Sequence, residues 1–376
     1  MSKSGLYIHI PFCRRKCNYC DFYLITNTNI LDRFLINLEN EMKILSEQYQ
    51  MIEFDTIFIG GGTPSLLNSN QINKLLINVN KYFNISGISE ITIESNPEDF
   101  IDDDNKLTEF RNAGVNRLSL GIQSFIDSEL AFLSREHTSA QAIKIVNNSL
   151  DIFNNVSIDL IYSLPNQKIS ELNQTIDKAI SLNVHHISAY TLIYEKETPV
   201  YNSLIRNQIK NNSDNFESEL YNLFSEKLIS KGFKHYEISN YAKSGFESMH
   251  NLKYWEYENY LGLGPSAHSF HNGVRWNNFR NIINYNIHLQ SNLLPTENKH
   301  LLTIQEKETE FLMLALRSKG VNLKKYFEAF NENFETKYKK EIRILIDNNY
   351  ANFYKNIFKL SEKGYSVADE IIVQYF

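Results

Sequence analysis

Short apolar runs alternate with amphipathic stretches along the first half of the chain, and this alternation constrains the fold more than any other feature. The runs are rich in β-branched and aromatic residues, as buried parallel strands are, and they cover residues 6–10, 54–59, 90–94, 117–122, 156–161 and 186–192. The stretches between them have the 3.6-residue periodicity of helices, at residues 30–46, 70–83, 102–112, 139–153 and 170–182. This order predicts βαβ units and a right-handed parallel sheet, arranged either as an open doubly wound sheet or as a partial (β/α) barrel.

The pattern changes after residue 205, which predicts a different organisation for the rest of the chain. A polar loop at 207–215 and a helix at 216–230 come first, and residues 235–280 are rich in Tyr, Trp, His and Asn with little periodicity. Helices at 304–317, 323–330 and 335–347, a hairpin at 350–360 and a helix at 362–375 then predict a small winged-helix-like unit. We expect a core at 1–230, a connecting segment at 231–300 and a C-terminal domain at 301–376.

All three cysteines of the chain lie within CRRKCNYC, residues 13–20, with the spacing C-x3-C-x2-C. A structural zinc site would need a fourth ligand, and the nearby His9 lies inside a predicted strand. A thioredoxin-like pair would leave Cys13 unexplained, and covalent haem attachment needs CxxCH, whereas Asp21 follows Cys20. A [4Fe–4S] cluster held by Cys13, Cys17 and Cys20, with one iron open to a ligand, fits the spacing better.

Polar side chains and glycines cluster where the predicted parallel strands end. GGGTPS at 60–65 follows the second strand, Glu94 ends the third, Gln123 closes the fourth and Asp159 interrupts the fifth. In both possible sheet arrangements the loops at the carboxyl ends of the strands bind ligands. Each residue taken alone is as compatible with a tight turn or a satisfied buried polar group, but their common position predicts one composite site.

Composition excludes several classes of function. The formal net charge is −6, so no basic surplus indicates nucleic acid. The N-terminus lacks a secretory signal and no stretch is apolar enough to span a membrane. With three cysteines that cannot all pair, these features predict a cytoplasmic protein. Any association with a membrane would then go through a partner such as a respiratory complex.

The C-x3-C-x2-C motif after the first strand resembles that of the radical S-adenosylmethionine (SAM) superfamily. The segments YIHIPFCRRKCNYCDFY, GGGTPS, RLSLGIQSF, SIDLIYSLPNQ, YEISNYA, HNLKYW and GLGPSAHS together resemble the HemW family of haem chaperones, relatives of oxygen-independent coproporphyrinogen III oxidase. The resemblance implies a partial (β/α)6 TIM-like barrel with a smaller C-terminal α+β domain. It implies cluster ligation by the three cysteines, and SAM binding by Tyr7, Gly61, Gly62, Thr63, Glu94, Gln123, Arg135 and Asp159.

The segment HNLKYW at 250–255 resembles the haem-binding motif of these chaperones. The resemblance implies His250 as an axial iron ligand, with Tyr254 and Trp255 offering flat apolar area to the porphyrin. His268 and His271 are alternative ligands. Read without the resemblance, the segment is equally an aromatic turn.

Two functions follow from the resemblance. The first is a haem chaperone that carries the cluster and SAM and delivers haem to apo-haemoproteins, respiratory proteins among them. The second is an oxidase that decarboxylates coproporphyrinogen III by radical chemistry. The oxidase motif has one more cysteine where this chain has Phe22, and a longer segment before the first strand. Both departures favour the chaperone. The sequence leaves open whether SAM is cleaved, and a homodimer is compatible with it.

Overall fold

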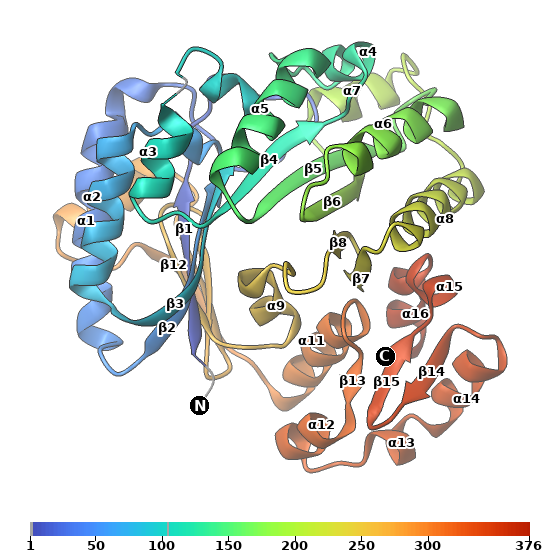
Figure 1. Ribbon diagram of the computed structural model, residues 1–376. Coiled ribbons are helices and arrows are strands. Elements are labelled where there is room, and N and C mark those ends of the chain that lie inside the picture. The colour runs from blue at the N-terminus through green and yellow to red at the C-terminus, as the bar shows by residue number, and fades with distance from the viewer. Residues whose placement is uncertain (1–2, 104) are drawn as a thin grey trace.

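The computed structural model describes residues 3–103 and 105–376. Six parallel strands form its centre, paired in chain order, and in Figure 1 they curve around a concave face. Their bounds are Ser4–Ile10 (β1), Glu53–Gly61 (β2), Asn84–Ser95 (β3), Arg117–Gln123 (β4), Val156–Tyr162 (β5) and His186–Thr191 (β6). Each of the six predicted strands is therefore confirmed.

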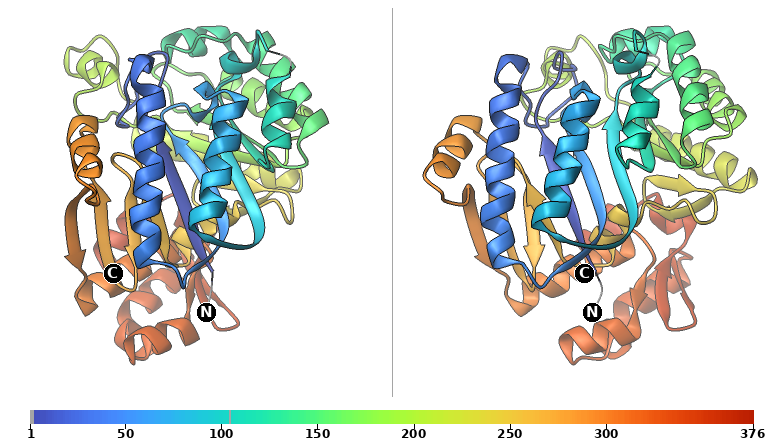
Figure 2. Two further views of the ribbon diagram at one scale, coloured as in Figure 1. Left: turned by 90° about the vertical axis from the view of Figure 1, so that its left-hand side faces the viewer. Right: turned by 60° about the vertical axis from the view of Figure 1, so that its left-hand side comes forward.

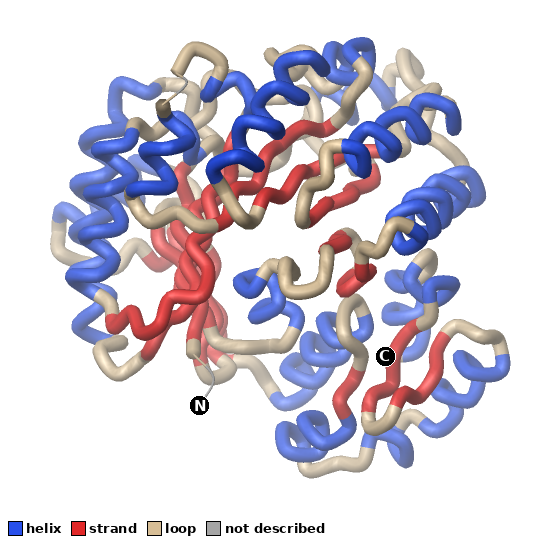
Figure 3. Tube along the Cα trace, in the orientation of Figure 1, coloured by secondary structure: helices blue, strands red, loops and turns tan. Residues whose placement is uncertain are grey.

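Helices cover the convex face of this sheet, as the views in Figure 2 and the blue tubes in Figure 3 show. The alternation along β1 explains the layering, because Leu6, Ile8 and Ile10 are fully buried in the outer core while Tyr7 and His9 face the concave side. The α-helices of residues 1–230 are Leu31–Gln48 (α1), Ser69–Tyr82 (α2), Lys106–Asn112 (α3), Asp127–Phe132 (α4), Ser139–Ile152 (α5), Ile169–Ser181 (α6), Pro199–Ile205 (α7) and Asp214–Ser230 (α8), of which α4 and α7 lie at the carboxyl end of the strands. Of the helix expected at 102–112, residue 104 lies outside the described residues.

The segment at 231–300 extends the same sheet at both of its ends, which sequence periodicity did not indicate. The strands Lys234–Glu237 (β7) and Asn240–Ala242 (β8) pair antiparallel beyond β6. On the other side, β1 pairs with Tyr260–Leu263 (β9), followed by His268–His271 (β10), Val274–Asn278 (β11) and Thr296–Leu301 (β12). The described sheet thus has twelve strands with β12 and β7 as its edges, so the barrel is partial. The domain boundaries at 230 and 300 stay a prediction.

Two helices complete this part of the chain. Met249–Trp255 (α9) lies on the concave side of the sheet, and Ile282–Gln290 (α10) packs beside α1 on the outside. Short 3-10 turns at Thr28–Ile30, Pro64–Leu66 and Pro97–Phe100 occupy loops before α1 and after β2 and β3.

The C-terminal unit has a core of its own and lies below the concave side of the barrel in Figure 1. Its described sheet has the order β13-β15-β14. The helices expected at 335–347 and 362–375 are each divided, the first at Tyr338 and the second between Tyr365 and Ala368. The elements are Ile304–Leu316 (α11), Val321–Asn322 (β13), Leu323–Phe330 (α12), Phe334–Lys337 (α13), Lys339–Asp347 (α14), Ala351–Tyr354 (β14), Ile357–Leu360 (β15), Glu362–Tyr365 (α15) and Ala368–Tyr375 (α16).

Candidate cofactor site

A cavity of about 530 Å³ lies at the carboxyl ends of β1 to β6. It brings together residues that are more than a hundred positions apart in the sequence, because every one of these strands ends at the same edge of the sheet. Of the residues expected at the composite site, it is lined by Cys13, Cys17, Cys20, Gly61, Gly62, Thr63, Glu94, Gln123, Arg135 and Asp159. Tyr7 lies further down β1, where its hydroxyl contacts His9 Nδ1 at 3.0 Å.

The three thiols lie on the loop that follows β1. Cys13 is buried and accepts a hydrogen bond from Thr63 Oγ1 at 3.3 Å. Cys17 and Cys20 are half-buried, and the Cys20 amide donates to the Cys17 carbonyl oxygen at 3.3 Å, which turns the loop back on itself. Burial raises the pKa of the Cys13 thiol to about 11, so a metal must displace a proton there on binding.

Among the residues that the structure describes, no three His, Cys, Asp or Glu side chains are grouped closely enough to hold a metal ion.

The glycine-rich loop after β2 lies directly against the cysteine loop. The Gly62 amide donates to the Ile10 carbonyl oxygen at 2.9 Å, and the Thr63 amide donates to that of Phe12 at 2.7 Å. A Cβ atom at position 62 would lie 2.6 Å from the Phe12 carbonyl oxygen. Only glycine permits this approach, so the loop has a steric reason for its composition.

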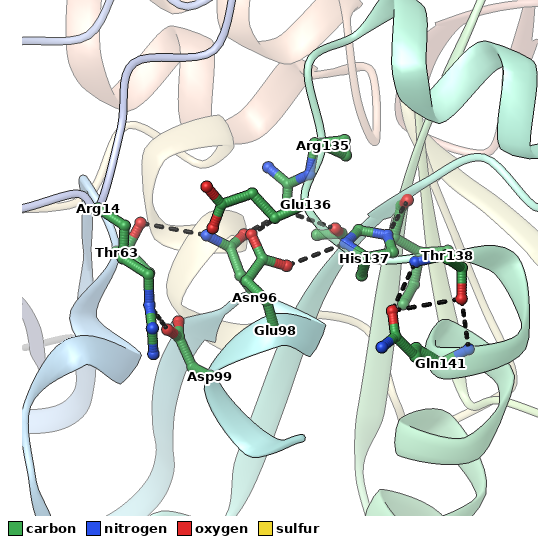
Figure 4. Close-up of polar contacts among 12 residues, drawn as sticks. Arg14, Thr63, Asn96, Glu98, Asp99, Arg135, Glu136, His137, Thr138 and Gln141 are labelled. Atoms are coloured by element: carbon green, nitrogen blue, oxygen red, sulfur yellow. Dashed lines mark hydrogen bonds and ion pairs between the residues drawn. The ribbon is translucent and has the colours of Figure 1, made fainter. Parts of the chain in front are cut away.

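Arg135 connects the cysteine loop to the rest of the cavity wall, and Figure 4 shows it beside Asn96 and Glu98. It lies in the loop between α4 and α5. Its guanidinium donates to Asn96 Oδ1 at 2.6 Å and to the Gly121 carbonyl oxygen at 3.0 Å, and its Nη1 lies 3.7 Å from Cys17 Sγ. Asn96 in turn donates to Thr63 Oγ1 at 3.2 Å, so a chain of hydrogen bonds runs between two of the thiols.

Two carboxylates face the cavity from neighbouring strands. Glu94 accepts from the Gly61 amide at 3.0 Å, and Asp159 accepts from Ser119 Oγ at 3.3 Å. Burial, reinforced by the charge of Asp159, raises the pKa of Glu94 to about 7, and burial also raises the pKa of Asp159. Neutral carboxyl groups in such surroundings can donate hydrogen bonds, and a cationic ligand would favour their ionised form.

Gln123 ends β4 with a positive φ of 67°, a conformation that costs energy in a residue other than glycine. A Cβ atom on Gly121 would lie 2.8 Å from Gln123 Nε2. The strained turn and the missing side chain at 121 together hold the Gln123 amide at the cavity wall.

The residues present fit a polar ligand next to a cluster. Ser95 Oγ and Arg135 Nε are buried and have no hydrogen-bond partner among the described residues, and both residues line the cavity. A buried donor without a partner costs about 1–3 kcal/mol, so these atoms indicate a polar group that completes the site. The donors match the carboxylate and hydroxyl groups of SAM, and the thiols match a cluster.

The HNLKYW segment forms α9, at the opposite end of the barrel from the cavity. His250 is fully buried, and its Nδ1 and Nε2 contact Thr56 Oγ1 at 2.9 Å and the Tyr254 hydroxyl at 2.8 Å. Burial lowers the pKa of His250 to about 3. Tyr254 and Trp255 are half-buried. His250 therefore closes the end of the barrel opposite the cavity, which we call the floor of the barrel. Its role as a haem ligand stays a prediction.

The alternative haem ligands lie on β10. His268 is exposed and His271 is half-buried. Partial burial lowers the pKa of each, which favours the neutral imidazole that binds metals.

Comparisons with known proteins follow the same division of the chain. Residues 7–179 match the Radical SAM superfamily, and residues 302–367 match the HemN C-terminal domain. Heme chaperone HemW of Bacillus subtilis (strain 168) is 34% identical over 97% of this chain and 97% of its own length. Heme chaperone HemW of Lactococcus lactis subsp. lactis (strain IL1403) is 32% identical over 99% and 97%. The chain belongs to the HemW family.

Family membership confirms the resemblance on which the sequence analysis relied. Coproporphyrinogen III oxidase (HemN) from Escherichia coli, a radical SAM enzyme, has a similar structure, with a TM-score of 0.85 over 99% of this chain and 90% of that one. Its identity to this chain is 21%, so this match concerns the fold. It confirms the partial barrel with a smaller C-terminal domain. No helix in the described part of this HemW family member is long and apolar enough to cross a membrane.

Several residues at the cavity escaped sequence reasoning. Asn96, Glu98 and His137 all connect to Arg135, directly or through one another. Asn96 and Glu98 follow directly after β3 in the segment ESNPE, so the rule that ligand loops follow parallel strands could have found them. His137 lies beyond a short helix and carried no comparable signal.

Proposed function

We propose that this chain is a haem chaperone that binds haem, transfers it to apo-haemoproteins, and carries a [4Fe–4S] cluster with an exchangeable SAM. The proposal rests on sequence identity of 30–34% to heme chaperones of several bacteria over nearly the whole chain. In the proposal haem is the cargo, and the cluster with SAM is the resident cofactor.

Cys13, Cys17 and Cys20 would hold the cluster at three corners. The cavity supports this assignment, because the loops that carry the thiols and the glycines meet there. When bound, such a cluster supplies an electron and an open coordination position. The chain itself would orient SAM: Arg135 through a carboxylate, Asp159 or Gln123 through ribose hydroxyls, and the loop at 61–63 through its backbone.

Haem binding through the motif at 250–255 requires a movement in this proposal. Both ring nitrogens of His250 are already engaged, so the ring must leave Thr56 and Tyr254 before either nitrogen can reach iron. The exposed His268 would need no such movement. Substitution of His250 and of His268 in turn would therefore identify the haem ligand.

The test is a haem titration of anaerobically reconstituted, cluster-loaded protein, followed by transfer to an apo-haemoprotein. We expect saturable haem binding, appearance of the acceptor's haem spectrum, and about four irons per chain before haem is added. Failure of the wild-type protein to bind or release haem would contradict the proposal.

The same preparation tests the oxidase. Incubation with coproporphyrinogen III, SAM and a reductant should yield no protoporphyrinogen, since Phe22 stands where the oxidase carries a further cysteine. Formation of protoporphyrinogen would make the chain an enzyme and contradict a function limited to haem delivery.

A further inference from the structure

Glu98, Arg135 and His137 form a buried polar group at the cavity wall, and contact with the cysteine loop does not account for Glu98 or His137. Glu98 Oε1 lies 3.6 Å from Arg135 Nη2, and Glu98 Oε2 lies 2.9 Å from His137 Nδ1 (Figure 4). Arg135 and His137 are 5% and 0% exposed at their side chains, and Glu98 is 13% exposed.

Two hydrogen-bond acceptors face the ring nitrogens of His137. Its Nε2 lies 3.1 Å from the Ile122 carbonyl oxygen, which can only accept a hydrogen bond. Its Nδ1 faces the Glu98 carboxylate, which also accepts when ionised. His137 therefore donates to Glu98 through Nδ1. Burial raises the pKa of Glu98, but hydrogen bonding from His137 and the charge of Arg135 together lower it below its ordinary value, so the carboxylate is ionised.

Glu98 is therefore shared between Arg135 and His137. A buried carboxylate that accepts from one side and pairs with a cation on the other is held in one place by opposing attractions. Its position fixes the guanidinium of Arg135, which at the same time reaches Asn96, Gly121 and the Cys17 sulfur.

We propose that His137 and Glu98 are positioning residues that hold Arg135 in the geometry in which it binds the SAM carboxylate beside Cys17. The inference rests on the proposed function, since it assumes that SAM occupies this cavity. Without the hydrogen bond from His137, the carboxylate of Glu98 is free to pair fully with Arg135 and draw the guanidinium away from the ligand.

Two substitutions at one position separate positioning from general support. His137→Asn places an amide near Nδ1 and retains a donor to Glu98, whereas His137→Gln places its amide near Nε2 and retains only the donor to Ile122. Both remove the ring, so a purely structural role would affect them alike. Glu129→Gln is a matched control, because this buried carboxylate accepts from Ser124 and Gln167 instead.

The experiment measures SAM dissociation constants by equilibrium dialysis on cluster-loaded protein, together with the change that SAM causes in the electron paramagnetic resonance spectrum of the reduced cluster. We expect His137→Gln to raise the dissociation constant on the order of tenfold and to alter the SAM-induced spectral change. The iron content should stay at the wild-type level. His137→Asn and Glu129→Gln should stay within about twofold of wild type, which is the size of effect expected without loss of a specific contact.

Glu98→Gln gives a second, independent variant in case His137→Gln does not fold. It removes the shared charge with little change of shape, and we expect the same weakening as for His137→Gln.

Equal weakening by the Asn and Gln variants would overturn the positioning role, as would unchanged SAM affinity in His137→Gln and Glu98→Gln. A wild-type protein that holds its cluster but binds no SAM would overturn the proposed cofactor as well as this inference. Failure of the inference alone leaves the wild-type affinity intact, so the two outcomes are distinct.

Discussion

Replacement of His250 by alanine tests whether this residue closes the floor of the barrel. The imidazole contacts Thr56 and Tyr254 through its nitrogens, and its ring lies 5.2 Å from that of Phe58 and 5.1 Å from that of Tyr254. All these contacts are buried inside the barrel, so water does not replace them when the imidazole is removed. We therefore expect a loss of stability that does not depend on haem.

The size of the loss follows from the contacts. Two buried hydroxyl groups lose their partner, at about 1 kcal/mol or more each. The cavity left by a buried ring costs about 2–3 kcal/mol more, by analogy with other large-to-small substitutions in cores. The sum is about 4–5 kcal/mol, against a total stability of about 5–15 kcal/mol for a typical protein. For a chain of this size that corresponds to a fall in Tm of roughly 6 °C.

Thermal unfolding of cluster-free protein, followed by circular dichroism without haem, measures this loss. The control is His300→Ala, because His300 is 58% exposed at its side chain and contacts Glu306 at the surface. The control should melt within about 2 °C of wild type. If His250→Ala also melted within 2 °C while its haem spectrum was lost, His250 would be a free ligand and the closed floor would be wrong.

Three further expectations concern the floor and the cavity. Wild type should gain stability relative to His250→Gln as the pH rises from about 3 to 6.5, because over this range the unfolded chain protonates His250 and the folded chain does not. Urea titrations of both proteins measure this difference in the free energy of unfolding. A difference that does not change with pH would contradict the low pKa. Replacing all three cysteines with alanine should abolish the iron content after reconstitution, and retention of a full cluster would refute the ligand assignment. Gly62→Ala should displace the glycine loop from Phe12 and reduce SAM affinity by about tenfold or more, as measured by dialysis, and an unchanged affinity would show that the loop does not contact SAM.

The parallel core was predictable because its signals are local. Each strand of the core is an apolar run bounded by polar residues, as at 117–122, and each helix carries one apolar face. The strands β7 to β12 were missed because they are short, and many of their residues are Tyr, His and Asn. Their pairing depends on partners distant in sequence, such as Tyr7 with Gly262, and no local pattern encodes it.

For the site too, the features that follow from strand order could be predicted, and those that depend on long-range contacts could not. Strand ends such as Glu94 could be placed at one edge of the sheet from topology alone, and the structure lines one cavity with them. The floor could not be foreseen, because His250 meets Thr56 across 194 positions. The buried triad behind Arg135 was hidden for a related reason: Glu98 and His137 acquire their roles only through a contact across 39 positions.

The floor also sets a cost for haem ligation by His250. Glu90, which is 3% exposed, accepts from the amides of Met249 and His250 at 3.0 Å each, and it lies 3.9 Å from the buried Arg117. Releasing α9 breaks the two amide hydrogen bonds to Glu90 as well as the contacts of the imidazole. If opening costs about 4 kcal/mol, the apparent haem affinity falls roughly a thousandfold below the intrinsic value. If haem binds at nanomolar concentration without release of α9, its ligand is therefore not His250. His268 on the neighbouring sheet extension is exposed and could bind haem without this cost.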